Sequence, residues 1–291
     1  MMTPTQTRRG AVVITGAAGG IGAATARRLD ALGFQVFAGV RRAADGELLQ
    51  RDISAQITPL LLDITDPNSI AMAAQTVAKT VGSAGLVGLV NNAGLIVEGP
   101  VELIPLAEVR KQFEVNVIGQ IAVTQAFLPL LRQARGRIIN IGAVSGRTAF
   151  PFIGVLSASK AALEALTDAL RVELRPWGMS VCIVEPAAMQ TRIFDKAAAA
   201  ASQARQQMPR QAQQLYAPAL AAVSKAIASQ PMDAPDVVAA TVAHALTARR
   251  PKTRYPVGPG ARLVVLLRLL PDRLRDSLLR RTLGIANVQP G

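Results

Sequence analysis

Short apolar runs alternate with helix-forming segments from residue 10 to residue 190, and this alternation limits the folds open to the chain more than any other feature. The runs are nearly continuous in valine, isoleucine and leucine, which is typical of strands that are buried on both faces. Strands joined by crossover helices form a parallel sheet with helices on both sides. No repeat or linker divides this stretch, so we predict one α/β domain with a doubly wound parallel sheet. The predicted strands are 11–16, 35–40, 57–64, 86–94, 136–144 and 179–186, and the predicted helices include 21–33, 68–82 and 108–133.

Composition narrows the class of protein further. Half of the 291 residues are hydrophobic, which is enough for a sizeable core without disulfides or a structural metal, and we predict no metal site. The formal net charge of +13 suits nucleic acid, an anionic membrane or a phosphorylated cofactor. Aromatic residues make up only 3% of the chain and do not alternate with the arginines, so we expect no nucleic-acid partner. Residues 1–9 are polar and resemble no signal peptide, so we expect a disordered tail and a cytoplasmic location.

A glycine-rich loop, TGAAGGIG, follows the first predicted strand. Gly16, Gly20 and Gly22 remove side chains where the chain turns sharply and where backbone amides at a helix N-terminus must approach a pyrophosphate. Other polar motifs follow later strands, and in a parallel sheet the carboxyl ends of the strands form the ligand crevice. We therefore predict a dinucleotide site there. The supporting motifs are LLDIT with Asp63, NNAG at 91–94 and VN at 115–116.

In this order, and with an SxSK segment at 157–160, these motifs resemble the short-chain dehydrogenase/reductase family over roughly residues 10–192. The resemblance implies a seven-stranded Rossmann fold and a nicotinamide-nucleotide site. It places Asp63 and Ile64 beside the adenine, and Asn91 and Ala93 on the adenosine-ribose side. It assigns the pyrophosphate and ribose to Thr15, Gly16, Gly20, Ile21 and Gly22, the nicotinamide ribose to Lys160, and the nicotinamide end of the site to Pro186 and Thr191.

The residues after the second predicted strand bear on which nicotinamide cofactor is bound. Enzymes that use NAD usually place a carboxylate there against the ribose 2′-hydroxyl, whereas enzymes that use NADP supply arginine for the 2′-phosphate. This chain has Gly39 where the acid would fall, followed by Arg41 and Arg42. Because arginine forks suit phosphate, we predict NADP(H) rather than NAD(H), although the two arginines would also suit a solvated loop.

The predicted catalytic residues depart from the family pattern. Family members use a tyrosine as general acid and base four residues before the lysine, and a serine thirteen residues before that tyrosine. Here Asn116 and Lys160 are retained, but the tyrosine position is Leu156 and the serine position is Ala143. Leucine has no proton to give to a developing alkoxide. Losing the general acid slows such a reaction by about 10²- to 10⁴-fold, so we expect ordinary alcohol dehydrogenation to be very slow.

Other residues offer only weak substitutes for the lost tyrosine. Ser157 and Ser159 point in other directions from the same helix, and Ser145 suits a turn. Tyr216 falls in the segment 192–232, which we predict to form a substrate lid. This segment is rich in alanine and glutamine, and an extended apolar insertion suits a bulky hydrophobic ligand.

The last segment, 259–291, carries leucines at three- and four-residue spacing with arginines between them. This pattern predicts a pair of basic amphipathic helices, separated at Pro271, that follow a main domain spanning 10–258. Such helices suit packing on the domain or on a partner subunit, or peripheral contact with a membrane. We expect a homodimer or homotetramer.

Three functions fit these observations. The first is an NADP(H)-binding member of the family that acts on a bulky hydrophobic small molecule, with the usual carbonyl-reductase mechanism disabled or altered, including non-redox chemistry such as cyclisation or isomerisation. The second is an NADP-dependent ketone or alcohol oxidoreductase, present in this sequence as an inactivated or engineered variant. The third is a non-catalytic ligand-binding protein or partner subunit.

Overall fold

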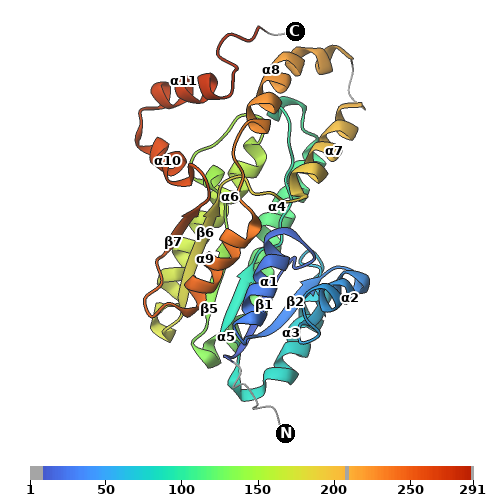
Figure 1. Cartoon of the computed structure of the whole chain (residues 1–291), viewed down its shortest axis with the longest axis vertical. Helices are drawn as coiled ribbons and strands as arrows, with labels where there is room; N and C mark the ends of the chain where they lie inside the picture. Colours follow the sequence, from blue (N-terminus) through green and yellow to red (C-terminus); the bar gives the residue numbers. More distant parts are fainter. Residues whose placement is uncertain (1–8, 207–209, 290–291) are drawn as a thin grey trace.

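The computed structural model describes residues 9–206 and 210–289, so the predicted tail at 1–9 lies almost entirely outside the described residues. Seven parallel strands form one sheet in the order β3-β2-β1-β4-β5-β6-β7, which confirms the predicted doubly wound fold (Figure 1). Strands β1 to β6 each lie within a predicted strand, and β7 lies beyond the last of these predicted strands. The strands are β1 (Ala11–Ile14), β2 (Gln35–Val40), β3 (Thr58–Leu61), β4 (Gly88–Asn91), β5 (Arg137–Ile141), β6 (Ser180–Pro186) and β7 (Arg254–Val257).

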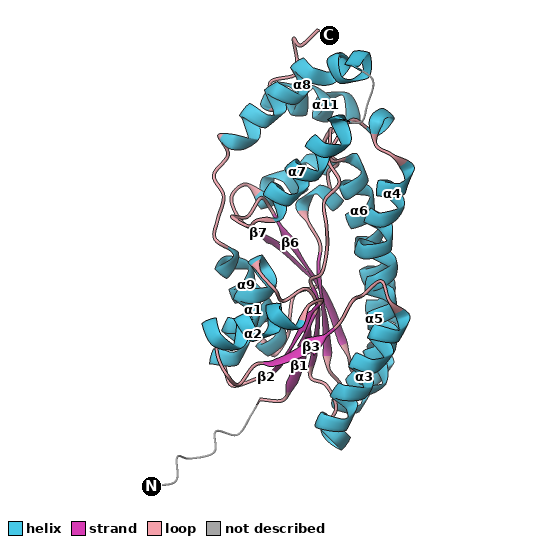
Figure 2. Ribbon diagram, turned by 90° about the vertical axis from the view of Figure 1, so that its right-hand side faces the viewer, coloured by secondary structure: helices cyan, strands magenta, loops and turns pink. Residues whose placement is uncertain are grey.

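Helices cover both faces of the sheet (Figure 2). One face packs against α1, α2 and α9 through a core that includes Ile14, Val36 and Val242. The other packs against α3, α5 and α6 through a core that includes Phe37 and Phe127. The sheet therefore separates two apolar cores, as its continuous hydrophobic strands require. These helices are α1 (Gly20–Ala31), α2 (Ala43–Asp52), α3 (Pro67–Val81), α5 (Gly119–Ala134), α6 (Gly154–Glu173) and α9 (Pro235–Thr247).

The remaining helices follow the carboxyl ends of the strands, and α7, α8 and α11 lie at the top of Figures 1 and 2. Two of them, α7 and α8, fall in the segment that we predict to be a substrate lid. The two ends of that segment meet where Met189 forms a β-bridge with Asp233. These helices are α4 (Leu106–Phe113), α7 (Ile193–Gln206), α8 (Arg210–Ala228), α10 (Ala261–Leu266) and α11 (Asp272–Thr282). The short turns η2 (Val101–Leu103), η4 (Val144–Gly146) and η6 (Leu267–Leu269) and the π-helical η3 (Glu114–Ile118) also follow strands, whereas η1 (Gly82–Ala84) and η5 (Arg175–Trp177) lead into β4 and β6 at the opposite edge of the sheet.

The connections of β1 determine where a ligand can bind. Strand β1 pairs with β2 on one side and with β4 on the other, so the crossovers from this region run in opposite directions. In an open parallel sheet such a switch point leaves a crevice at the carboxyl ends of the strands. The glycine loop after β1 and the NNAG segment after β4 lie at this point.

Candidate functional site

The loop between β1 and α1 comes too close to its neighbours to carry side chains at two positions. A Cβ atom at Gly16 would lie 2.8 Å from the Cα of Ala93, and one at Gly22 would lie 2.3 Å from the carbonyl oxygen of Gly16. Gly16 and Gly20 also have positive φ angles of 64° and 53°. Helix α1 begins without a side-chain cap, so its first amides are free to bind an anion. These features fit the pyrophosphate of a dinucleotide.

A small hydrogen-bond clamp holds this loop against the segment after β4. The Thr15 hydroxyl oxygen accepts hydrogen bonds from the amides of Asn92 and Ala93, both at 2.9 Å. In return the Asn92 side chain donates to the carbonyl oxygens of Thr15, at 2.9 Å, and Gly16, at 3.0 Å. Our sequence analysis assigned no role to Asn92, although the second asparagine of NNAG was the available signal. Thr15 and Asn92 therefore shape the crevice.

Asn91 has its side chain turned into the interior. It is fully buried and donates to Thr124 Oγ1 and Asn140 Oδ1, both at 2.9 Å. The side chain thus links β4 to α5 and β5, and only the Asn91 backbone is available to a nucleotide. The neighbouring Ala93 carbonyl accepts a hydrogen bond from Gln120.

The predicted adenine end lies after β3. The Asp63 carboxylate accepts hydrogen bonds from the Thr65 amide, at 2.9 Å, and from the Thr65 hydroxyl, at 2.7 Å. Burial acts to raise the pKa of Asp63, but the Thr65 hydrogen bonds and the charge of Arg41 lower this pKa overall. The Ile64 side chain is buried in the core, so only its backbone can face a ligand. Asp63 therefore presents a fixed negative charge beside Arg41.

The two arginines after β2 differ in their environment. Arg42 forms a two-pronged ion pair with Asp45, at 2.9 and 2.7 Å, and this hydrogen bonding raises its pKa. Arg41 is exposed and has no ion pair among the described residues. A Cβ atom at Gly39 would lie 2.8 Å from the Ile14 carbonyl oxygen, so the backbone leaves no room for a carboxylate there. Of the two, Arg41 is the better placed to meet a phosphate.

The segment after β6 closes over the glycine loop from the other side. Pro186 ends β6, and Thr191 Cγ2 lies 3.2 Å from where a Gly20 Cβ would be. The Arg192 guanidinium lies 4.0 Å from the corresponding position at Gly19, so it adds positive charge beside the predicted pyrophosphate site. A cavity of about 260 Å³ opens between this segment and α1. Our sequence analysis missed Arg192, although it directly follows the predicted Thr191.

Lys160 lies in the second turn of α6 and is buried. Its Nζ donates a hydrogen bond to the Ile141 carbonyl oxygen at 2.7 Å, and burial lowers the pKa of Lys160 to about 8. Leu156 lies one helical turn earlier, on the same side of α6, and is buried. The two positions therefore share one helix face. An acid at position 156 would lie beside Lys160, but this chain has an apolar side chain there.

Asn116 lies in the π-helical turn η3, between α4 and α5. Its side-chain oxygen accepts from the Leu95 amide at 2.9 Å, and its amide donates to the Leu95 carbonyl, at 3.0 Å, and to Ser159 Oγ, at 3.2 Å. Ser159 in turn donates to the Leu156 carbonyl at 2.8 Å. The structure thus connects Asn116 to the backbone of Leu156 through Ser159, a connection that our sequence analysis missed.

The profile described as short chain dehydrogenase matches residues 10–202 of this chain. The chain belongs to the short-chain dehydrogenase family. Family membership agrees with the resemblance inferred from the motifs, and it places the protein in a family of oxidoreductases.

This family member is similar to retinol dehydrogenase 5 of Mus musculus, with 39% identity over 279 residues that cover 92% of this chain and 87% of that protein. It is 37% identical over 279 residues to 17-beta-hydroxysteroid dehydrogenase type 6 of Bos taurus, covering 93% and 88%. Among solved structures, a short chain dehydrogenase from Burkholderia cenocepacia J2315 in complex with NADP has a TM-score of 0.70 and 27% identity, covering 92% of this chain and 95% of that one.

The other hydroxyl groups near the family's catalytic position differ in their surroundings. Ala143 begins η4 with extended backbone, and the buried Ser145 that follows has no hydrogen-bond partner among the described residues. Ser157 accepts a long contact of 3.5 Å from the Phe150 amide. The exposed Tyr216 hydroxyl donates to Glu102 at 2.6 Å, and this hydrogen bond raises the pKa of Tyr216, which makes it a weaker acid.

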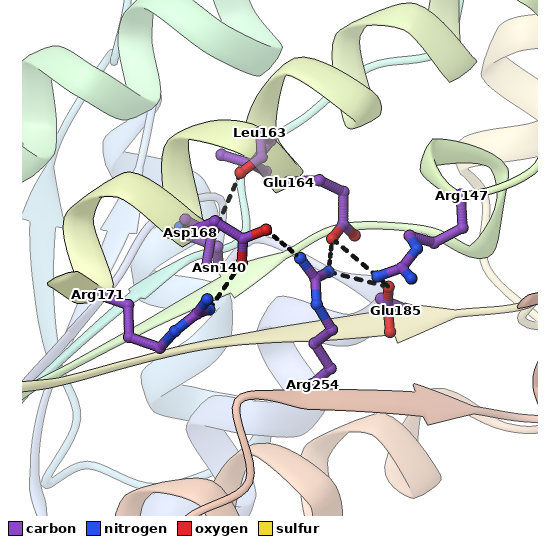
Figure 3. Close-up of polar contacts among 9 residues, drawn as sticks. Asn140, Arg147, Leu163, Glu164, Asp168, Arg171, Glu185 and Arg254 are labelled. Atoms are coloured by element: carbon purple, nitrogen blue, oxygen red, sulfur yellow. Dashed lines mark hydrogen bonds and ion pairs between the residues drawn. The ribbon is translucent and has the colours of Figure 1, made fainter.

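A cluster of charged residues joins α6 to β6 and β7 (Figure 3). Arg254, from β7, contacts Glu164 and Asp168 of α6, with 2.6 Å to Asp168, and it lies 3.5 Å from Glu185 of β6. Arg147 approaches Glu185 at 3.7 Å. Burial raises the pKa of Glu185, while the charge of Arg147 opposes this rise. The cluster ties α6, which carries Leu156 and Lys160, to the sheet.

Proposed function

We propose that the protein binds NADP(H) and acts on a bulky hydrophobic small molecule with the family's usual carbonyl-reductase mechanism disabled or altered. One observation carries this proposal: the position one turn before the buried Lys160 holds Leu156, whereas the nucleotide crevice keeps its glycines and its clamp. A chain with this pattern retains cofactor binding and lacks the usual proton donor.

The charge at the adenine end supports NADP(H) as the cofactor. Gly39 excludes a carboxylate by its backbone packing, and Arg41 is exposed without a competing ion pair among the described residues. Arginine favours phosphate over a neutral hydroxyl because its charged fork forms paired hydrogen bonds. The Burkholderia relative, crystallised with NADP, supports the same choice.

The names of two relatives support a bulky apolar substrate, since one is a retinol dehydrogenase and the other a hydroxysteroid dehydrogenase. Helices α7 and α8 stand beyond the carboxyl ends of the strands, where the family resemblance places a substrate lid. Their alanine-rich sequences present short apolar side chains. We propose that a hydrophobic ligand binds beneath them.

The chemistry of the chain's own residues follows from these positions. A bound nicotinamide supplies or accepts a hydride. Lys160, with its pKa near 8, holds a positive charge at neutral pH that orients ribose hydroxyls and polarises its surroundings. Leu156 and Ala143 offer neither a proton nor an oxyanion hydrogen bond, so alkoxide formation is slowed by about 10²- to 10⁴-fold. The same apolar wall suits chemistry without an oxyanion, such as isomerisation or cyclisation.

Fluorescence titration of the purified protein with NADPH and, separately, NADH tests cofactor binding. We expect saturable binding with NADPH bound more tightly. If neither cofactor binds at millimolar concentration, the proposal is wrong, because the glycine loop would then have only a structural role.

Restoring the family residues tests the proton-transfer half of the proposal. The double substitution Ala143→Ser with Leu156→Tyr should raise NADPH-dependent ketone reduction by at least about 100-fold. Ala143→Ser with Leu156→Phe is the matched control, because phenylalanine fills the same space without the hydroxyl. A gain in the tyrosine variant but not in the phenylalanine variant supports a disabled reductase. The same outcome also fits an inactivated oxidoreductase. Equal rates in both variants, despite intact NADPH binding, would contradict it and favour a ligand-binding or partner role.

A further inference from the structure

The C-terminal helices expose an apolar surface that the other described residues do not cover. Five leucines along α10, η6 and α11 are between 41% and 78% exposed. On α11 the exposed Leu274 and Leu278 lie one turn apart, whereas Leu279 and Leu283 point inward and are buried. The inward leucines attach the helix to the protein, whereas the described residues leave much of the surface of the outward leucines uncovered. The exposed leucines, called here the leucine face, are Leu263, Leu266, Leu269, Leu274 and Leu278.

Positive charge surrounds the leucine face. The segment 261–285 contains six arginines against two aspartates. Both aspartates, Asp272 and Asp276, lie beside Arg275, at 2.8 and 3.9 Å. The other five arginines are exposed and have no ion pair among the described residues. These are Arg262, Arg268, Arg273, Arg280 and Arg281.

This combination of exposed leucine and unpaired arginine fits one class of partner. In a two-fold dimer the same patch faces itself, so a second copy would bring like charges together, and protein interfaces generally exclude charge from their centre. An anionic bilayer instead offers acyl chains to the leucines and negative headgroups to the arginines. Among the described residues, only Leu106–Ala134 is long and apolar enough to cross a bilayer, and as α4 and α5 it lies along the sheet, so we consider contact with the surface. We propose that the leucine face docks on an anionic lipid bilayer.

The position of this face gives docking a consequence. Helix α10 is joined to the loop after Ala143 by a hydrogen bond from Thr148 Oγ1 to the Val264 carbonyl oxygen, at 2.8 Å. Gly284, just after α11, lies against Ala222 of α8. Docking would thus place α8, a helix of the proposed substrate lid, next to the bilayer, where apolar molecules dissolve (Figure 1). This consequence rests on the proposed function, whereas docking itself does not.

Co-sedimentation of the whole chain with lipid vesicles, without cofactor or substrate, tests docking. We expect binding to phosphatidylcholine vesicles that contain about 30% phosphatidylglycerol and little binding to pure phosphatidylcholine. Raising the salt from about 0.15 to 0.5 M should weaken this binding, because screening acts on the arginines. Equal sedimentation with and without anionic vesicles overturns the proposal.

Two variants and their controls assign the binding to this face. Replacing Arg273, Arg280 and Arg281 by glutamine should weaken vesicle binding by roughly 100-fold, since each arginine near an anionic surface contributes about a factor of five. Replacing Leu263, Leu266 and Leu269 by glutamine should weaken it more than tenfold. The matched controls are Arg249→Gln with Arg250→Gln, and Leu61→Gln with Met72→Gln, all exposed and remote from the face.

The controls should bind vesicles as the unmodified chain does, and far-ultraviolet circular dichroism reports whether each variant is folded. Equal loss in controls and test variants contradicts the proposal. If the leucine variants instead abolish a dimer seen by analytical ultracentrifugation, while vesicle binding is absent throughout, the face is occupied by a second copy and the bilayer proposal is wrong.

Discussion

The two halves of the crevice are held in place by different kinds of force. The nucleotide half, from β1 to β4, depends on glycines and on neutral hydrogen bonds such as those between Thr15 and Asn92. The proton-transfer half, on α6 and η4, depends on a buried lysine and on a cluster of ionised side chains anchored by Arg254. Neutral contacts do not titrate near neutrality, whereas buried charges respond to pH and to the loss of a partner. The half with Leu156 and Ala143 is therefore the electrostatically sensitive one.

The largest expected effect comes from removing the centre of the charged cluster. Arg254→Leu leaves Glu164 and Glu185 buried with only Arg147 nearby, which should lower the free energy of unfolding by about 3–5 kcal/mol. Urea denaturation measures this change. Arg51→Leu, which breaks an exposed pair with Asp52, is the matched control and should have little effect. Similar losses in the two variants would mean that the cluster does not anchor α6.

The next largest effect is the pH dependence of the free energy of unfolding that the buried Lys160 gives to the proton-transfer half. The pKa of Lys160 is about 8 in the folded protein and near 10.5 in the unfolded chain. Between these values the unfolded state binds more protons, so the free energy of unfolding rises with pH, by up to about 3 kcal/mol. Below pH 8 the lysine is charged in both states, and the cost of burying that charge is constant.

The control for this series is Lys160→Met, which removes the titrating group and keeps the length of the side chain. Urea unfolding without cofactor at pH 8, 9 and 10 should show the unmodified chain gaining stability relative to the variant. If the free energy of unfolding changes with pH in the same way in both proteins, burial does not lower the pKa of Lys160. The two halves would then not differ in their response to pH.

The sequence predicted most of the nucleotide half because its motifs are local. Apolar runs and glycines predicted the positions of β1 and α1 correctly, and the predicted Asn116 is connected through Ser159 to the backbone of Leu156. Helix α2 was missed because Gly46 and the charged residues around it break its apolar pattern; this glycine lets the helix lie against Pro59.

The contacts of the proton-transfer half could not be predicted from the sequence because they join distant parts of the chain. Arg147, Glu164, Glu185 and Arg254 come from four elements, and no spacing along the sequence brings them together. The inward turn of the Asn91 side chain likewise depends on Thr124 and Asn140, which lie on other elements. Tertiary packing rather than local pattern determines both.

A smaller effect sharpens the cofactor assignment within the nucleotide half. Arg41→Ala should reduce the preference for NADPH over NADH by roughly tenfold, because a charged hydrogen bond to phosphate would be lost. Arg42→Ala is the matched control and should change the preference less, since the Arg42 guanidinium is already paired with Asp45. Separate titrations with the two cofactors give the ratio. A larger change in this preference in the Arg42 variant would show that Arg42, and not Arg41, contacts the phosphate.

The smallest effect decides whether the lid supplies the missing acid. Tyr216→Phe removes the hydroxyl that donates to Glu102 and keeps the ring that packs edge-on against Phe152, with ring centres 6.4 Å apart. Because the hydrogen bond is exposed, the melting temperature should change by less than about 2 °C. Because the Tyr216 pKa is raised, any residual ketone reduction should be unchanged as well. A loss of that residual rate with an unchanged melting temperature would identify Tyr216 as a proton donor, and Leu156 would then mark a relocated acid rather than a lost one.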